Sequence, residues 1–145
     1  MSEKPFEKST CRILYFSVRS VQEKLVHIAK RSRLHFQKKE VFLIFVEDEK
    51  GEAFIDEWLW KFPAEGFLPH KIVSEPSSEP IAITRVKKNL TGAKWAFNLC
   101  STPLLLPGFR IIYDFEDHST QSKESLSALR FSSYQQAGYT LIHET

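Results

Sequence analysis

The chain has 145 residues, of which 42% are hydrophobic and 26% charged, and this is typical of one globular domain that folds without disulfides or metals. The net charge of +2 argues against nucleic acid as a direct partner. The two cysteines are far apart, and no apolar run is long enough for a signal peptide or a membrane span. We therefore expect a single cytoplasmic domain over residues 1–145, flexible at 1–10, with no membrane association.

Alternating strand and helix patterns run along the chain. Val41–Val46 (VFLIFV) is typical of a strand covered on both faces, and Ser20 is a suitable N-cap. Pro63 ends one helix, and Gly138 another. In chain order we predict strand 13–18, helix 21–36, strand 41–46, helix 51–62, strands 70–73, 81–84, 94–99 and 109–115, helix 119–137 and strand 139–142. The order predicts an α/β fold, a Rossmann-like three-layer α/β/α domain with a largely parallel central sheet.

The usual signatures of nucleotide binding and catalysis are missing from this sequence. None of its five glycines lies within ten residues of another, so it has neither a GxGxxG turn nor a P-loop. It has no GxSxG elbow, and its five histidines show no metal-ligand spacing. We therefore expect no nucleotide-binding glycine loop, no catalytic residues, no metal and no cofactor.

One enzymatic alternative rests on two acidic clusters, each at a predicted strand end. If the two strands are parallel neighbours, the carboxylates meet at one sheet edge and can hold Mg²⁺ for a phosphodiesterase. Acidic residues are also common in turns that follow strands. The clusters are Glu47, Asp48 and Glu49, and Asp114, Glu116 and Asp117.

The segment from Phe54 to His70 (FIDEWLWKFPAEGFLPH) is rich in aromatic residues flanked by prolines. Aromatic anchors dominate the energetics of protein interfaces. Either these side chains all belong to the core or the segment is a partner-binding surface, and for the whole set we favour the partner surface.

This segment, together with two motifs elsewhere in the chain, resembles the chi subunit of bacterial DNA polymerase III. That family has a DE-x-LW helix ending, a P-A-E-x-F-x-P-H loop, an acidic turn after the second strand and a terminal R-Y-x-x-Y-x-x-A-G-[FY] pattern. The matching residues are Asp56, Glu57, Leu59 and Trp60; Pro63, Ala64, Glu65, Phe67, Pro69 and His70; Glu47, Asp48 and Glu49; and Arg130, Phe131, Tyr134, Ala137, Gly138 and Tyr139.

The resemblance implies a non-catalytic adaptor in DNA replication. It would link the clamp loader, through the psi subunit, to the acidic C-terminal tail of single-stranded DNA-binding protein. The psi-binding residues would be Trp58, Phe62, Pro63, Phe67, Leu68 and Pro69. The tail-binding residues would be Trp60, Lys123, Ser127, Arg130, Phe131 and Tyr134. An adaptor of the same fold that serves a DNA-repair helicase is the alternative.

An acidic tail with an apolar end needs an apolar slot beside cations. Helical spacing places Lys123, Ser127, Arg130 and Tyr134 on one face of the final helix, and we expect that face to be accessible. The opposite face would then pack on the core, with Leu126, Leu129, Ser133 and Ala137. This sequence also departs from the family: two positions that carry tail-binding basic residues in better-known chi proteins are Glu124 and Ala128 here. Lys123 and Arg130, or Arg85 and Lys87, are the possible replacements.

Overall fold

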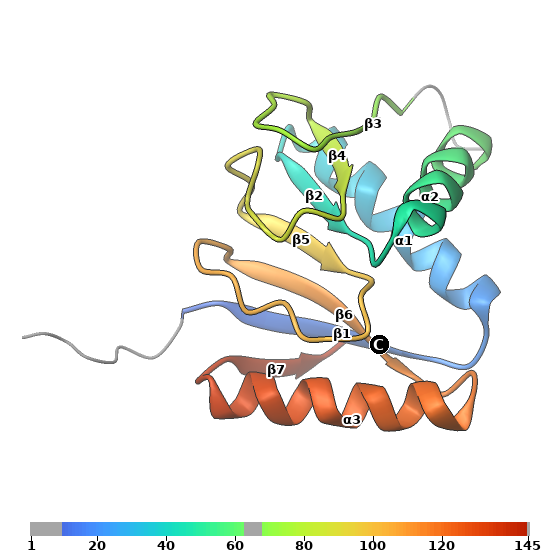
Figure 1. Cartoon of the computed structure of the whole chain (residues 1–145), viewed down its shortest axis with the longest axis vertical. Coiled ribbons are helices and arrows are strands. Elements are labelled where there is room, and N and C mark those ends of the chain that lie inside the picture. The colour runs from blue at the N-terminus through green and yellow to red at the C-terminus, as the bar shows by residue number, and fades with distance from the viewer. Residues whose placement is uncertain (1–9, 63–67, 145) are drawn as a thin grey trace, which may run out of the picture.

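The computed structural model describes residues 10–62 and 68–144 (Figure 1). The predicted flexible start lies outside the described residues except for Thr10. The elements in chain order are β1 (Arg12–Val18), α1 (Val21–Gln37), β2 (Phe42–Phe45), α2 (Glu49–Lys61), β3 (Lys71–Ile72), β4 (Ile81–Thr84), β5 (Trp95–Asn98), β6 (Ile111–Asp117), α3 (Gln121–Gln136) and β7 (Thr140–His143). Each predicted element therefore exists, and the boundaries differ from the prediction by a few residues.

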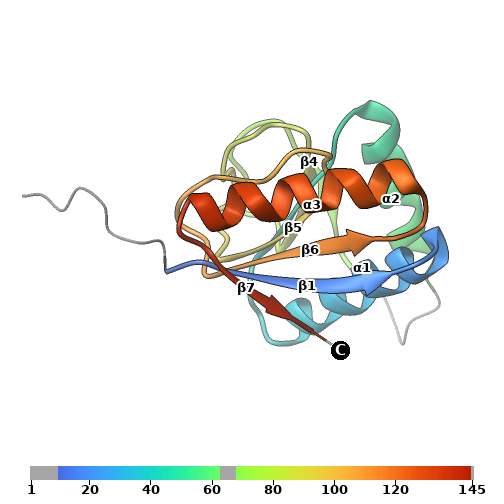
Figure 2. The same cartoon turned by 90° about the horizontal axis from the view of Figure 1, so that it is seen from below.

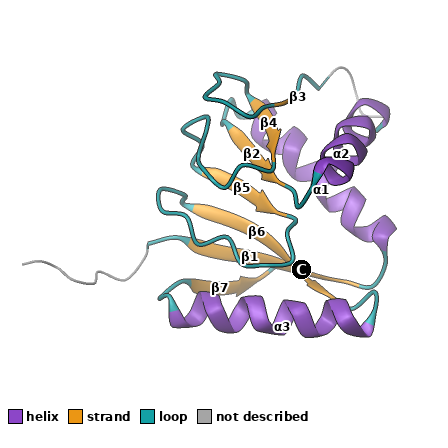
Figure 3. Cartoon of the chain, in the orientation of Figure 1, coloured by secondary structure: helices purple, strands orange, loops and turns teal. Residues whose placement is uncertain are grey.

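The strands form one sheet in the order β3-β4-β2-β5-β6-β1-β7. Every neighbouring pair is parallel, as when Phe42 of β2 stands opposite Ile81 on one side and Trp95 on the other. All arrowheads therefore point to the same edge of the sheet, which we call the carboxyl edge (Figure 3).

Helices cover both faces of this sheet. Alternate residues of β2 separate into two cores, with Phe42 and Ile44 on the side of α1 and α2 and Leu43 and Phe45 on the other side. The second core includes Tyr134 of α3. Figure 2 shows α3 on one side of β6 and β1 and α1 on the other. The predicted three-layer α/β/α fold is confirmed.

The three helices all begin at the carboxyl edge, where a polar side chain caps each of them. Ser20 Oγ accepts from Glu23 N at 3.1 Å, Asp48 Oδ1 accepts from Gly51 N at 2.8 Å, and Thr120 Oγ1 accepts from Lys123 N at 3.1 Å. Such caps satisfy backbone donors that have no partner inside the helix. Because Asp48 caps α2, this helix starts two residues earlier than predicted. None of the helices in the described ranges is long and apolar enough to cross a membrane.

The rotation of α3 about its axis differs from the prediction. Ser127, Arg130 and Tyr134 are buried, whereas Leu126 is 38% and Leu129 65% exposed. The face that we expected to be accessible therefore packs against the sheet, and the leucines expected in the core point outward. The physical reason is a buried ion pair between Arg130 and Asp114 of β6.

Candidate functional site

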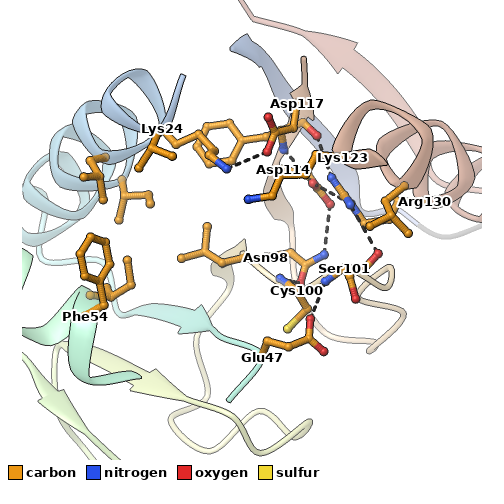
Figure 4. A pocket seen from close by; sticks show the side chains of 17 residues that line it. Lys24, Glu47, Phe54, Asn98, Cys100, Ser101, Asp114, Asp117, Lys123 and Arg130 are labelled. Atoms are coloured by element: carbon orange, nitrogen blue, oxygen red, sulfur yellow. Dashed lines mark hydrogen bonds and ion pairs between the residues drawn. The ribbon is translucent and has the colours of Figure 1, made fainter. Parts of the chain in front are cut away.

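A cavity of about 380 Å³ opens at the carboxyl edge, where the three helices begin (Figure 4). Its lining comes from α1, α2 and α3 and from the ends of β5 and β6. In open parallel sheets, ligands bind in the crevice outside the carboxyl ends of the strands. Its position and its concave shape make this cavity the candidate site.

Each helix contributes one exposed apolar side chain to the wall of this cavity. Val21 of α1 is 50% exposed, Phe54 of α2 is 53% exposed and Leu126 of α3 is 38% exposed. Contact between large apolar side chains and water is unfavourable, and burying them lowers the free energy. Three of them around one hollow form an apolar slot that a ligand side chain can fill.

Two lysines stand together at one end of the slot. Lys24 Nζ donates to Asp117 Oδ2 at 2.7 Å, and Lys123 extends into the same space (Figure 4). The charge of Lys24 is the main reason why the pKa of Lys123 is lowered. Burial pushes the pKa of Asp117 upward, but hydrogen bonds from Lys24 and Ser119 outweigh it and lower that pKa overall. The cationic end therefore holds two ammonium groups around one ionised carboxylate.

A buried polar cluster forms the floor of the cavity. Arg130 Nε donates to Asp114 Oδ1 at 3.1 Å, and the other carboxylate oxygen accepts from Tyr134 Oη at 2.7 Å and from Asn98 Nδ2 at 3.1 Å. The Arg130 guanidinium also donates to the backbone oxygen of Phe115 at 2.9 Å. Burial raises the pKa of Asp114, and the neighbouring Arg130 acts in the opposite direction. These bonds fix Arg130 in the floor, so it supports the site more than it reaches toward a ligand.

The cavity also contains a thiol, but its surroundings make it a poor nucleophile. Burial raises the pKa of the Cys100 thiol, although Lys87 Nζ lies 2.9 Å from its sulfur and acts in the opposite direction. The thiolate is the reactive form of cysteine, and a raised pKa disfavours it. Apolar walls, two lysines and a rigid floor are suited to binding an anionic ligand with an apolar group.

The structure brings together only part of the predicted tail-binding set. Lys123 and Arg130 line the cavity, and Ser127 lies beneath it, where it donates to Phe115 O at 3.3 Å. Tyr134 is fully buried in the floor, and Phe131 is half-buried with its ring 4.7 Å from that of Tyr15. Trp60 is 50% exposed on α2, where its ring lies 4.1 Å from that of His70, and it does not line the cavity.

Sequence reasoning missed Val21, Lys24 and Phe54 as site residues. All three lie within the first two turns of helices that follow parallel strands. The rule that ligands bind at the carboxyl ends of parallel strands is the signal that could have identified these three residues.

The predicted psi-binding residues lie partly in the core. The Trp58 indole donates to Leu25 O at 2.9 Å, and Leu68 is buried. Phe62 is half-buried with its ring 5.3 Å from that of Trp58, and Pro69 is also half-buried. The other two predicted psi contacts, Pro63 and Phe67, lie outside the described residues.

The strands of the two acidic clusters are not neighbours, because β5 lies between β2 and β6 in the sheet. The condition on which the Mg²⁺ alternative depended is therefore not met, although Glu47, Asp114 and Asp117 line the same cavity. The Asp114 carboxylate is enclosed by Arg130, Tyr134 and Asn98, and Glu47 accepts from Ser101 N at 2.7 Å. Within residues 10–62 and 68–144, no group of three or more His, Cys, Asp or Glu side chains is arranged to hold a metal ion.

Comparisons with known proteins point to one family. A family model described as "DNA polymerase III chi subunit, HolC" matches residues 3–142. The DNA polymerase III subunit chi of Escherichia coli (strain K12) is 30% identical over 103 residues, which cover 68% of this chain and 69% of the relative. The crystal structure of T4 UvsW superposes with a TM-score of 0.61 at 12% identity, over 98% of this chain and 43% of that one. At that identity the likeness to UvsW concerns the fold alone.

Proposed function

The chain belongs to the DNA polymerase III chi subunit family, and from that premise we propose that it is a non-catalytic accessory subunit of the DNA polymerase III holoenzyme in the cytoplasm. In this role it links the clamp loader, through the psi subunit, to the acidic C-terminal tail of single-stranded DNA-binding protein. It acts by binding two proteins at once. Its contribution to replication is to hold the polymerase assembly at single-stranded DNA that carries the single-stranded DNA-binding protein.

The chemistry of the cavity at the carboxyl edge is the observation that carries this proposal. An acidic peptide with an apolar end requires an apolar slot next to fixed cations. Phe54 and Leu126 are among the walls of such a slot, and Lys123 stands at its cationic end. Burial raises the pKa of the Cys100 thiol, so this cysteine is not activated as a nucleophile.

The psi subunit is proposed to bind the segment that follows α2. Trp58 precedes this segment and Leu68 follows it, and both pack against the core. Phe62 and Pro69 are half-buried, and Pro63 and Phe67 lie outside the described residues. The aromatic residues of this segment support the proposal, because aromatic anchors dominate the energetics of protein interfaces.

Fluorescence-anisotropy titration tests the tail-binding half of the proposal. A labelled peptide with the last ten residues of the organism's own single-stranded DNA-binding protein is titrated with the full chain. We expect a dissociation constant of about 1 to 10 µM that rises with salt, because screening weakens contacts between charges. A peptide of the same composition in scrambled order is the control. If neither peptide binds at low salt, the tail-binding role is refuted.

Co-purification tests the psi half. The chain is co-expressed with psi, and Phe67→Ala is compared with Glu57→Ala, which changes an exposed residue of α2. Loss of psi with Phe67→Ala but not with Glu57→Ala is the expected result. Retention of psi by Phe67→Ala would remove this segment from the proposed interface.

A further inference from the structure

We propose that the ammonium groups of Lys24 and Lys123 bind the terminal carboxylate of the acidic tail. The side chains of Val21, Phe54 and Leu126 then surround its last apolar residue, and Asp117 competes with the tail for Lys24. This inference rests on the proposed function and deepens it, because it assigns the chemical groups that recognise the end of the tail.

The cationic end of the cavity carries an excess of positive charge. Asp117 contacts Lys24 at 2.7 Å, and its charge also acts on Lys123, so one carboxylate serves two neighbouring ammonium groups. Ser119 holds Asp117 in place through its backbone N at 2.9 Å and its hydroxyl at 2.6 Å. One positive charge therefore remains uncompensated within the pair, and a second carboxylate can neutralise it.

Both lysines lie near the N-termini of their helices. Lys123 is in the first turn of α3, and Lys24 lies four residues after the Ser20 cap of α1. Positive side chains near a helix N-terminus are unfavourable, because the helix dipole already places partial positive charge there. Two lysines in such positions, next to each other, reduce the stability of the free protein. A bound anion reverses that cost, because it interacts favourably with both lysines and with both helix ends.

The cavity is small for a ligand site. Its volume of about 380 Å³ is near the lower end of the range of roughly 300–1,000 Å³ that is usual for ligand cavities. It suits one large side chain with its carboxylate better than a long peptide. The end of the tail supplies both groups on a single residue, and the acidic residues before it remain near the rim.

The two family positions that carry basic residues in other chi proteins supply no cation here. Arg85 pairs with Glu52 at 3.4 Å, and neither Arg85 nor Lys87 lines the cavity. Glu124 is exposed on α3, and its carboxylate lies 2.8 Å from His118 Nδ1. A carboxylate at this position repels an acidic tail, and Ala128 supplies no charge. Arg130 is fixed to Asp114 in the floor. Lys24 and Lys123 are the cations that point into the cavity (Figure 4).

The experiment compares the tail peptide as a free acid with the same peptide as a C-terminal amide. Both are titrated against the full chain and against Lys24→Met, Lys123→Met and the double variant. For the unchanged chain we expect the amide to bind about tenfold more weakly, since a charge-assisted contact is lost. In the double variant the free acid should weaken about tenfold and the amide little, so that the two peptides bind alike.

Two further variants separate direct recognition by the two lysines from a structural role of this region. Asp117→Asn should tighten binding of the free acid about three- to tenfold, because a competing negative charge is removed. A merely structural role of Asp117 predicts weaker binding instead. Lys88→Met, at an exposed lysine outside the cavity, should change the affinity less than twofold. Circular dichroism checks the fold of each variant. Lys123→Met should keep the fold, because Lys123 is an exposed residue of α3.

The possible results distinguish the inference from the function on which it rests. If the double lysine variant keeps the difference between acid and amide, or if Lys88→Met weakens the free acid as much as the double variant does, the subsite is wrong while tail binding stands. If the unchanged chain binds neither peptide, the proposed function itself fails.

Discussion

Asp114 holds the floor of the cavity together through a single carboxylate. It pairs with Arg130 at 3.1 Å and accepts hydrogen bonds from Tyr134, Asn98 and the backbone N of Phe115. Arg130 is itself buried. Removing one member of a buried ion pair leaves the other charge without compensation, which is far more costly than losing an exposed pair.

We therefore expect Asp114→Ala to lower the free energy of unfolding by about 3–5 kcal/mol. Urea denaturation followed by circular dichroism measures the change. Glu57→Ala is the matched control, since it breaks an exposed i,i+4 pair with Lys61 and should cost at most about 0.5 kcal/mol. Equal losses in the two variants would contradict the role of Asp114 in holding the floor together.

His35 links stability to pH through a buried hydrogen-bonded chain. Its Nδ1 lies 2.8 Å from Glu40 Oε1 and its Nε2 lies 2.8 Å from Tyr113 Oη. Burial lowers the pKa of His35 below 6.5, although Glu40 acts in the opposite direction. When pH falls through about 6.5, the unfolded chain takes up a proton that the folded chain does not, so the folded state loses stability.

The unfolding free energy should therefore decrease as pH falls from about 8 to about 5, with His35 contributing up to about 1.4 kcal/mol per pH unit. Denaturation curves at several pH values measure this slope. In His35→Gln the slope should be shallower than in the unchanged chain, while the contributions of the other histidines cancel in the comparison. A steeper slope in His35→Gln would show that the imidazole is stabilised in its charged form.

At the scale of elements, the sequence predicts the helices and strands well because their signals are local. Ser20 caps α1 as predicted, and Gly138 adopts the positive φ of 90° that ends α3. The predicted rotation of α3 was wrong because the rotation depends on a distant contact. Hydrophobicity alone predicts that Leu126 and Leu129 face the core. In the structure Arg130 faces the core instead, because it pairs with Asp114, which lies sixteen residues earlier in the chain. A buried ion pair of this kind leaves no local pattern.

Two substitutions on α3 test its orientation. Leu129→Lys should change the free energy of unfolding by at most about 0.5 kcal/mol, because the side chain is 65% exposed. Tyr134→Ala should cost about 3–5 kcal/mol, because it leaves a cavity and removes a hydrogen bond to Asp114. Thermal and urea denaturation of both variants give the comparison. If α3 were instead rotated so that Leu129 lay in the core, Leu129→Lys would lower the free energy of unfolding more than Tyr134→Ala.

At the scale of the whole molecule, the order of the strands decides which residues share the site. The sequence predicts parallel strands, but no local pattern in it predicts their order in the sheet, which is β3-β4-β2-β5-β6-β1-β7. That order brings Lys24 of α1 to Lys123 of α3 and places Phe54 of α2 opposite them. Sequence reasoning identified Lys123 from its own helix but missed the other two, since their nearness depends on long-range packing.

The strand order also leads to a prediction about magnesium. β5 separates β2 from β6, and the Asp114 carboxylate already serves Arg130, so Asp48 and Asp114 do not form a shared metal site. A ligand that binds only the folded state stabilises it by RT ln(1 + [L]/Kd), so it raises the unfolding temperature as its concentration exceeds its dissociation constant. We therefore expect Mg²⁺ to produce no more thermal shift than an equal ionic strength of NaCl. We also expect no Mg²⁺-dependent cleavage of single-stranded DNA, duplex DNA or nucleotides. A Mg²⁺-specific thermal shift that Asp48→Ala abolishes, accompanied by cleavage, would instead favour the phosphodiesterase alternative over a purely binding role.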